Sequence, residues 1–250
     1  MKRLLLPAAI IMLTGGLVSI AAPQAQAATF APTDLDSLSL GAKIVGPVGP
    51  EVETTFVNDS GEGIGDLSSS VSCPASFSSC LPPTNPTGTL YTYIHQVTPG
   101  IDFPNDPPFP APGVVLPVEG VEAFRLNFPA SGFNGVAGYS FSEATAALGD
   151  ASGLTVEEAN DGSLVWRAPA DAGWDTSETI SFFWQTTQNP SGPGGIYELL
   201  GDGQSGTANG PVPTPVVIAP PATEVPEPSA IAPLALLSLG GLLLKRRALA

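Results

Sequence analysis

The residues that could perform catalytic chemistry are few in this sequence. Its single histidine, His95, stands on an alternating segment with Tyr91 and Tyr93 on the same face. Histidine is a good general base near neutral pH, but it needs a nucleophile or a substrate within reach. No Gly-x-Ser-x-Gly, phosphate-binding loop or His-Glu-x-x-His pattern is present. We therefore interpret His95 as part of a strand face and expect no enzymatic activity.

Paired carboxylates are a second possible catalytic device. Glycoside hydrolysis needs two acids held close together across a cleft. The nominal candidates are Glu157 with Glu158, and the stretch from Asp171 to Asp175. Neighbouring residues of a strand point to opposite faces, so Glu157 and Glu158 cannot form such a pair if this stretch is extended. A secreted hydrolase is accordingly the least favoured of the functions considered.

A calcium site is the alternative to our expectation of no cofactor. The segment from Asn58 to Asp66 places several oxygen donors on one loop, but Gly61 and Gly63 interrupt the spacing of an EF-hand. The same residue types are ordinary turn formers. Zinc is not expected, because Cys73 and Cys80 have no second Cys or His pair to complete a site. We expect these two cysteines to form a disulfide in an oxidising compartment.

The three tryptophans have two possible roles. Trp166, Trp174 and Trp184 could stack on sugar rings, or they could fill the core of the domain. An exposed cluster of these rings with Tyr91 or Tyr93 would indicate a carbohydrate-binding module.

The elements that position these residues read as a mainly β fold. We expect an antiparallel, β-sandwich-like domain over residues 28–200, with a possible module boundary at the proline-rich stretch 100–117 and a Gly/Ser/Thr/Pro-rich stalk over 201–224. A short helix is expected over residues 140–148, ending at Gly149. The expected strands are 53–57, 89–97, 121–128, 138–141, 163–167, 179–186 and 196–200.

The N-terminal residues have the layout of a secretory signal peptide. Lys2 and Arg3 precede an apolar run over residues 4–20, and Ala25, Gln26 and Ala27 form a small-x-small pattern. We expect a signal peptide over residues 1–27, with cleavage between Ala27 and Ala28. A retained membrane anchor is the alternative.

The C-terminal residues form an ordered set of three features. Val225, Pro226, Glu227, Pro228 and Ser229 precede an apolar run over 230–244, which ends at Lys245, Arg246 and Arg247. A helix of that run is about 22 Å long, short for a hydrocarbon core of about 30 Å. The basic residues at both ends favour the cytoplasmic side, so the residues between the two apolar runs are expected outside.

This C-terminal arrangement resembles the PEP-CTERM sorting signal, a tail also described as an ice-binding-protein C-terminal domain. The resemblance covers about residues 224–250. It implies export, transient membrane anchoring through residues 230–244, and recognition by an exosortase-like membrane protease that cleaves near the motif in bacteria that make exopolysaccharide. A plain tail anchor is the alternative.

Charge further limits the class of partner. Five of the eight basic residues lie in the two terminal segments, which leaves three basic against 23 acidic residues and a net charge of −20 between them. This charge opposes nucleic acid and anionic lipid. It indicates either solubility alone or a preference for divalent cations and neutral glycans.

Taken together, these features predict an exported cell-surface or extracellular-matrix protein. We expect it to be structural or adhesive, to be a substrate of signal peptidase and of an exosortase-like protease, and to associate with exopolysaccharide or biofilm. A carbohydrate-binding module of the matrix is the alternative.

Overall fold

In the residues that the structure describes, the backbone folds into one curled sheet of strands with one short α-helix. The computed structural model describes residues 27–44, 51–103, 107–170 and 173–215. The chain divides into two units, Met1–Thr214 and Pro215–Ala250, and the elements below all belong to the first. The strands are β1 Ala28–Phe30, β2 Thr33–Asp34, β3 Leu40–Lys43, β4 Val52–Asn58, β5 Gly63–Pro74, β6 Tyr91–Pro99, β7 Val121–Leu126, β8 Phe133–Tyr139, β9 Thr155–Glu158, β10 Leu164–Arg167, β11 Ile180–Thr186, β12 Pro190–Gly201 and β13 Gln204–Pro213.

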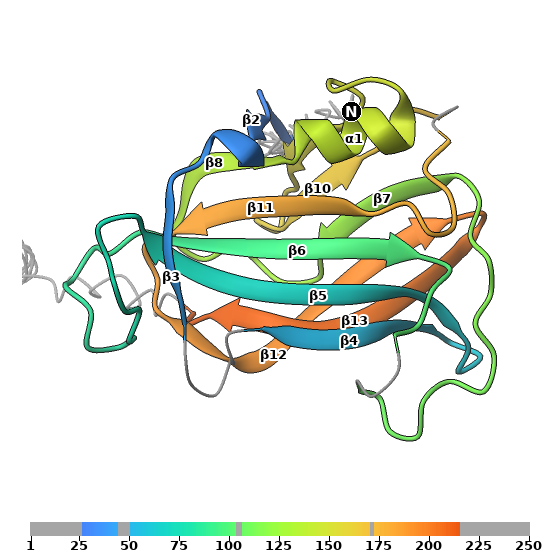
Figure 1. The fold of residues 1–250 in the computed structure, drawn as a ribbon, viewed down its shortest axis with the longest axis horizontal. Helices are drawn as coiled ribbons and strands as arrows, with labels where there is room; N and C mark the ends of the chain where they lie inside the picture. Colours follow the sequence, from blue (N-terminus) through green and yellow to red (C-terminus); the bar gives the residue numbers. More distant parts are fainter. Residues whose placement is uncertain (1–26, 45–50, 104–106, 171–172, 216–250) are drawn as a thin grey trace, which may run out of the picture. The chain divides into compact units, whose positions relative to one another are not determined.

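The strand order is β1-β9-β10-β7-β12-β13-β4-β5-β6-β11-β8-β2, with β3 paired to β5. The pairs are antiparallel except β2 with β8. The sheet curls (Figure 1), so strands distant in this order face each other across the core. The ring of Phe124 on β7 lies 4.9 Å from that of Phe182 on β11, and His95 on β6 lies 4.4 Å from Tyr197 on β12. The expectation of a mainly β fold is therefore confirmed.

The first residues of the described chain connect the two edges of the sheet. We call residues 28–37 the N-terminal clasp. Its strand β1 pairs with β9, and its strand β2 pairs with β8, near the opposite end of the strand order. The 3-10 helix η1 (Leu35–Ser37) follows directly. The clasp therefore bridges strands from both ends of the sheet.

Two carboxylates of the clasp anchor it to the helix α1 (Phe141–Leu148). Asp34 accepts a hydrogen bond from the Phe141 amide at 3.1 Å, and Asp36 accepts one from the Ser142 hydroxyl at 2.7 Å. Both acids lie at the helix N-terminus, where the unpaired amides and the helix dipole favour negative charge. Ser140 caps the helix, and Gly149 ends it in the left-handed conformation. The short helix expected from the sequence is confirmed.

Six of the seven expected strands coincide with β4, β6, β7, β10, β11 and β12, give or take a few residues at their ends. The strand expected at 138–141 is displaced: β8 ends at Tyr139, and Ser140 instead caps α1. The strand β5, which pairs with both β4 and β6, was not anticipated, because half of its residues are glycine or serine.

The expected stalk over residues 201–224 is wrong for its first half. Residues 204–213 form β13, which pairs along its length with β12. The small residues that suggested a flexible stalk are needed for close packing. A Cβ atom at Gly206 would stand 2.7 Å from Ile64, and one at Gly210 would stand 2.6 Å from Tyr197. The domain therefore extends to Thr214.

The proline-rich stretch 100–117 is not a module boundary. It belongs to the same compact unit as the strands on either side. Its described residues are bound to the sheet: the Thr55 amide donates to Pro107 O at 2.9 Å, and the Leu116 amide donates to Gly63 O at 2.8 Å. Prolines lack amides, but their carbonyls still accept hydrogen bonds from neighbouring strands.

We predict that Gly138→Ala destabilises the domain by opening the clasp. A Cβ atom at this β8 position would lie 1.9 Å from Thr33 O on β2, so one strand must move. Overpacking of this kind costs about 1–3 kcal/mol. Urea unfolding measures the loss. Gly192→Ala on β12 is the control, since its Cβ meets nothing within 4 Å; equal midpoints for the two variants would contradict the prediction.

Candidate functional site

His95 lies in a fully buried hydrogen-bonded cluster. Its Nδ1 is 3.0 Å from the Ser69 hydroxyl, and its Nε2 accepts a hydrogen bond from the Trp184 indole N–H at 3.3 Å. Because the indole can only donate, Nε2 must be the unprotonated nitrogen, and Nδ1–H donates to Ser69. Burial lowers the pKa of His95 from 6.5 to about 3, which keeps the ring neutral at physiological pH.

The Ser69–His95 pair is structural, although it contains the two side chains of a nucleophile and its base. The proton on Nδ1 leaves that nitrogen unable to accept the serine proton. Both residues are buried, His95 completely, so a substrate could not reach them. The interpretation of His95 as a strand-face residue beside tyrosines agrees with this geometry: its ring lies against Tyr93 and Tyr197.

The carboxylates named from the sequence hold loops and strands in place. Glu157 pairs with Arg167 across β9 and β10, with 3.1 Å between Oε2 and Nε. Asp175 accepts a hydrogen bond from the Gly120 amide, and Glu178 accepts one from the Asp175 amide, both at 2.7 Å. Asp171 lies outside the described residues. These contacts give no pair of acids facing one cleft.

In the candidate calcium loop, Asn58, Asp59, Ser60 and Glu62 line one shallow pocket. The side chain of Asn58 organises the turn, accepting from the amides of Ser60 and Glu62 and donating to the Glu62 carboxylate at 3.0 Å. Asp66 lies on β5, where it is buried and accepts from the Phe103 amide. Within the described part of the chain, no group of three His, Cys, Asp or Glu residues could hold a metal ion.

The expected sugar-stacking platform is not formed by the residues named for it. Trp166, Trp174 and Trp184 are completely buried, as is Tyr93, and Tyr91 is 1% exposed. The indole N–H groups of Trp166 and Trp174 donate to backbone carbonyls at 2.9 Å. The tryptophans therefore build the core, the alternative that the sequence left open.

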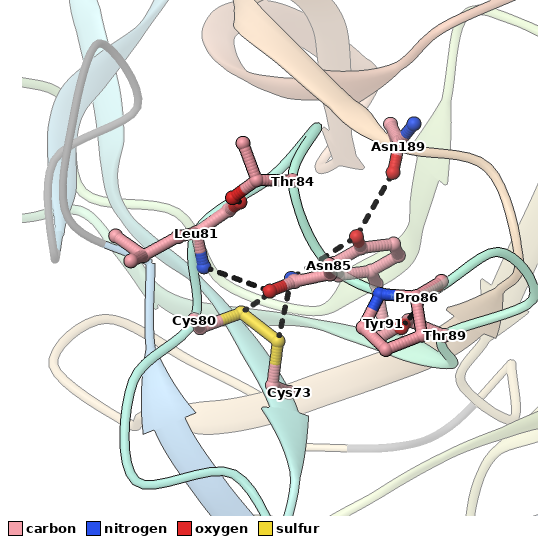
Figure 2. Close-up of a disulfide and its surroundings, with 9 residues drawn as sticks. All are labelled: Cys73, Cys80, Leu81, Thr84, Asn85, Pro86, Thr89, Tyr91 and Asn189. Atoms are coloured by element: carbon pink, nitrogen blue, oxygen red, sulfur yellow. Dashed lines mark hydrogen bonds between the residues drawn. A yellow bond between two sulfur atoms is a disulfide. The ribbon is translucent and has the colours of Figure 1, made fainter.

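Cys73 and Cys80 form a disulfide with a Cα–Cα distance of 5.6 Å. Figure 2 shows Asn85 beside it: the Asn85 amide donates to Cys73 Sγ at 3.3 Å and to the Tyr91 hydroxyl at 3.2 Å. The Tyr91 hydroxyl in turn donates to Asn189. The disulfide thus closes the loop after β5 and, through Asn85 and Tyr91, connects it to the segment before β12.

The expected processing sites lie at or beyond the two ends of the domain. Ala27 and Ala28 are exposed, and Ala28 is the first residue of β1. Ala25 lies outside the described residues, as do the motif 225–229, the apolar run 230–244 and the basic residues Lys245, Arg246 and Arg247. Within the described residues, no helix is long and apolar enough to cross a membrane.

One surface feature was not singled out from the sequence. Residues 107–118 contain no side chain that is charged or polar, and we call them the apolar loop. Phe109 is 71% exposed and Val114 is 53% exposed. The available signal was the twelve-residue run without a polar side chain, which we interpreted only through its prolines.

Next to the apolar loop lies a groove with a volume of about 250 Å³. Backbone pairing between β4 and β13 is limited to Asn58 and Val57. Farther along, the Thr54 hydroxyl donates to Asn209 O at 2.7 Å, and these two residues help to line the groove. The groove is lined by Thr54, Thr55, Val57, Pro107, Pro108, Thr207, Ala208 and Asn209. Comparison of the chain with protein-family models, curated proteins and solved structures finds no match.

We predict that His95 makes the domain sensitive to acid. The unfolded chain binds a proton at this residue near pH 6.5, whereas the folded chain binds it only near pH 3. Stability is therefore lost as the pH falls through this window, by about 2 kcal/mol between pH 6.5 and 4.5. Denaturant unfolding at the two pH values, compared with His95→Gln, isolates this loss. Equal pH dependence of both proteins would contradict it.

The disulfide is predicted to contribute to stability by restricting the unfolded chain. Replacing both Cys73 and Cys80 with alanine should lower the free energy of unfolding by about 2–3 kcal/mol. The control is the double alanine variant of Ser78 and Ser79, two exposed residues of the same loop. Thermal unfolding under non-reducing conditions compares the two. A cysteine variant as stable as the serine control would rule out the contribution.

Proposed function

We propose that the chain is an exported cell-surface or matrix protein with a PEP-CTERM-type sorting tail, and that its role is structural or adhesive. The observation that carries this is the order of features at the C-terminus: the motif Val225–Ser229, the apolar run 230–244 and the basic cluster 245–247. A signal-peptide pattern at the opposite end gives the same topology. The sandwich-like domain between them would then lie outside the cytoplasmic membrane.

The described domain is compatible with this proposal in three ways. Its two cysteines are joined in a buried disulfide, as suits an oxidising compartment. The residue pairs that suggested catalysis have structural roles instead. The first strand begins at Ala28, so cleavage after Ala27 would remove the leader without removing any residue of the sheet.

The corrected domain boundary shortens the connection between the domain and the motif. Strand β13 ends at Pro213, and the motif begins at Val225. The intervening residues, 214–224, reach at most about 35–40 Å when fully extended. A protease acting at the motif would therefore work close to the folded domain, and the domain would be held near the membrane until it is released.

The proposed partners follow from this topology and from charge. Signal peptidase and an exosortase-like membrane protease would act on the two ends. Exopolysaccharide is the expected environment of the released protein. The net charge of −20 between the terminal segments disfavours nucleic acid. A carbohydrate-binding role would need side chains other than the buried tryptophans.

Intact-mass measurement of the protein from its native surface fraction tests the proposal. We expect the mature form to begin at Ala28 and to end near the motif. Changing Pro226, Glu227 and Pro228 to alanine should leave the tail in place and keep the protein in the membrane fraction. The matched control changes Pro211, Pro213 and Pro215 to alanine, which removes three prolines upstream of the motif.

The possible outcomes test processing at the C-terminus and at the N-terminus separately. A native protein that retains residues 244–250 would show that the tail is only an anchor and would contradict sorting. A native protein that retains residues 1–27 would contradict cleavage of the leader. Loss of processing in the control as well would show that the motif is not what is recognised.

A further inference from the structure

The apolar loop is the most exposed hydrophobic feature of the described domain. Phe109 and Val114, both in this loop, have more than half of their surface exposed. Contiguous exposed apolar surface on an otherwise soluble domain marks a site of interaction. The loop has no side-chain donor or acceptor, so its partner must be recognised by shape and apolar contact.

The loop is anchored to β4 and β5 by backbone hydrogen bonds at Pro107, Val114 and Leu116. The Thr55 amide donates to Pro107 O, the Gly63 amide to Val114 O and the Leu116 amide to Gly63 O, all within 2.9 Å. Just before the loop, Asp102 accepts from the Thr55 hydroxyl at 2.7 Å. A surface fixed in this way loses little conformational entropy when it binds.

The groove beside the loop is large enough to hold the side chain of Phe109. An apolar cavity of about 150 Å³ accommodates a benzene ring, so the volume of about 250 Å³ here is sufficient for a phenyl side chain. No residue lining it is charged, and Pro107 and Pro108 form one of its walls. Two carboxylates lie close to its lining: Asp102 accepts a hydrogen bond from the Thr55 hydroxyl at 2.7 Å, and Glu198, opposite Thr207, is paired with Arg125.

We propose that this face binds a second copy of the chain, with Phe109 of each copy inserted into the groove of the other. A projection and a matching groove side by side on one face are what a two-fold symmetric contact requires. Two copies of so acidic a domain repel each other over most of their surfaces. Residues 107–118 themselves carry no charged side chain, so contact through them adds no repulsion of their own.

The contact is small, so the dimer is weak in dilute solution. A loop and a single groove bury less than the area of a stable interface. Proteins concentrated on a surface or in a matrix meet at a much higher effective concentration, at which a weak contact is populated. Adhesion between neighbouring copies would follow. This inference does not depend on how the two ends of the chain are processed.

Sedimentation equilibrium of the full chain tests the proposal, in the same nonionic detergent throughout so that association through residues 230–244 is common to all samples. We expect a concentration-dependent dimer that strengthens when salt is raised, because screening weakens the repulsion. Phe109→Ala removes the projection, and Thr207→Trp fills the groove; each should weaken the dimer about tenfold or more. Leu81→Ala, an exposed leucine of the disulfide loop, should not.

A mixture of the two variants gives the sharpest readout. Phe109→Ala retains an open groove and Thr207→Trp retains Phe109, so a mixed pair recovers one of the two contacts. With one variant fluorescently labelled, the mixed pair should associate more tightly than either variant alone. A monomer at every concentration, or a dimer unaffected by both substitutions, would overturn the proposal, as would a mixture no tighter than its components.

Discussion

The packing of Phe124 is the interaction on which the curl of the sheet depends. Its ring contacts five other rings from five different strands, and the centroid distances range from 4.9 to 6.4 Å. These partners are Phe56 on β4, His95 on β6, Trp166 on β10, Phe182 on β11 and Tyr197 on β12. A flat sheet could not bring these strands together. Each buried ring removes a large apolar area from water, so the curled state is the one that this core stabilises.

A core built from aromatic rings has to satisfy the polar groups that those rings carry. Trp166 donates to Gly138 O, Trp184 donates to His95, and the Tyr197 hydroxyl donates to Pro211 O. The Trp166 bond joins β10 to β8, two strands that are not paired in the sheet, whereas the other two bonds reinforce paired strands. Among the described residues, the buried Tyr93 hydroxyl has no hydrogen-bond partner. The lowered pKa of His95 is a consequence of this arrangement, because an imidazolium would have no acceptor at Nε2.

The sequence predicts the fold where strand residues are large and fails where they are small. Alternating aromatic and β-branched residues identified β6 and β11, and Ser140 with Gly149 marked the helix. Strands β5 and β13 were missed because glycine and serine ordinarily indicate turns. In this fold, glycine is required where another side chain packs directly against the backbone, as Ile64 does at Gly206. That requirement depends on contacts between distant segments, which local composition cannot reveal. The disulfide could be predicted from two cysteines and an oxidising compartment. The groove could not be predicted, because it depends on how β4 and β13 lie beside each other in the fold.

The acidic surface and the apolar loop have opposite effects on contact between two copies of the chain. A net charge of −20 outside the two terminal basic clusters opposes indiscriminate aggregation, because it keeps most surfaces of neighbouring molecules apart. Repulsion of this kind also makes any uncharged face the preferred place of contact. Phe109 and Val114 of the apolar loop are exposed on such a surface, whereas Val118 at its end is buried and Leu116 packs against the core. Charge repulsion therefore disfavours contact through most of the surface, and the contact that we propose is made through the apolar loop.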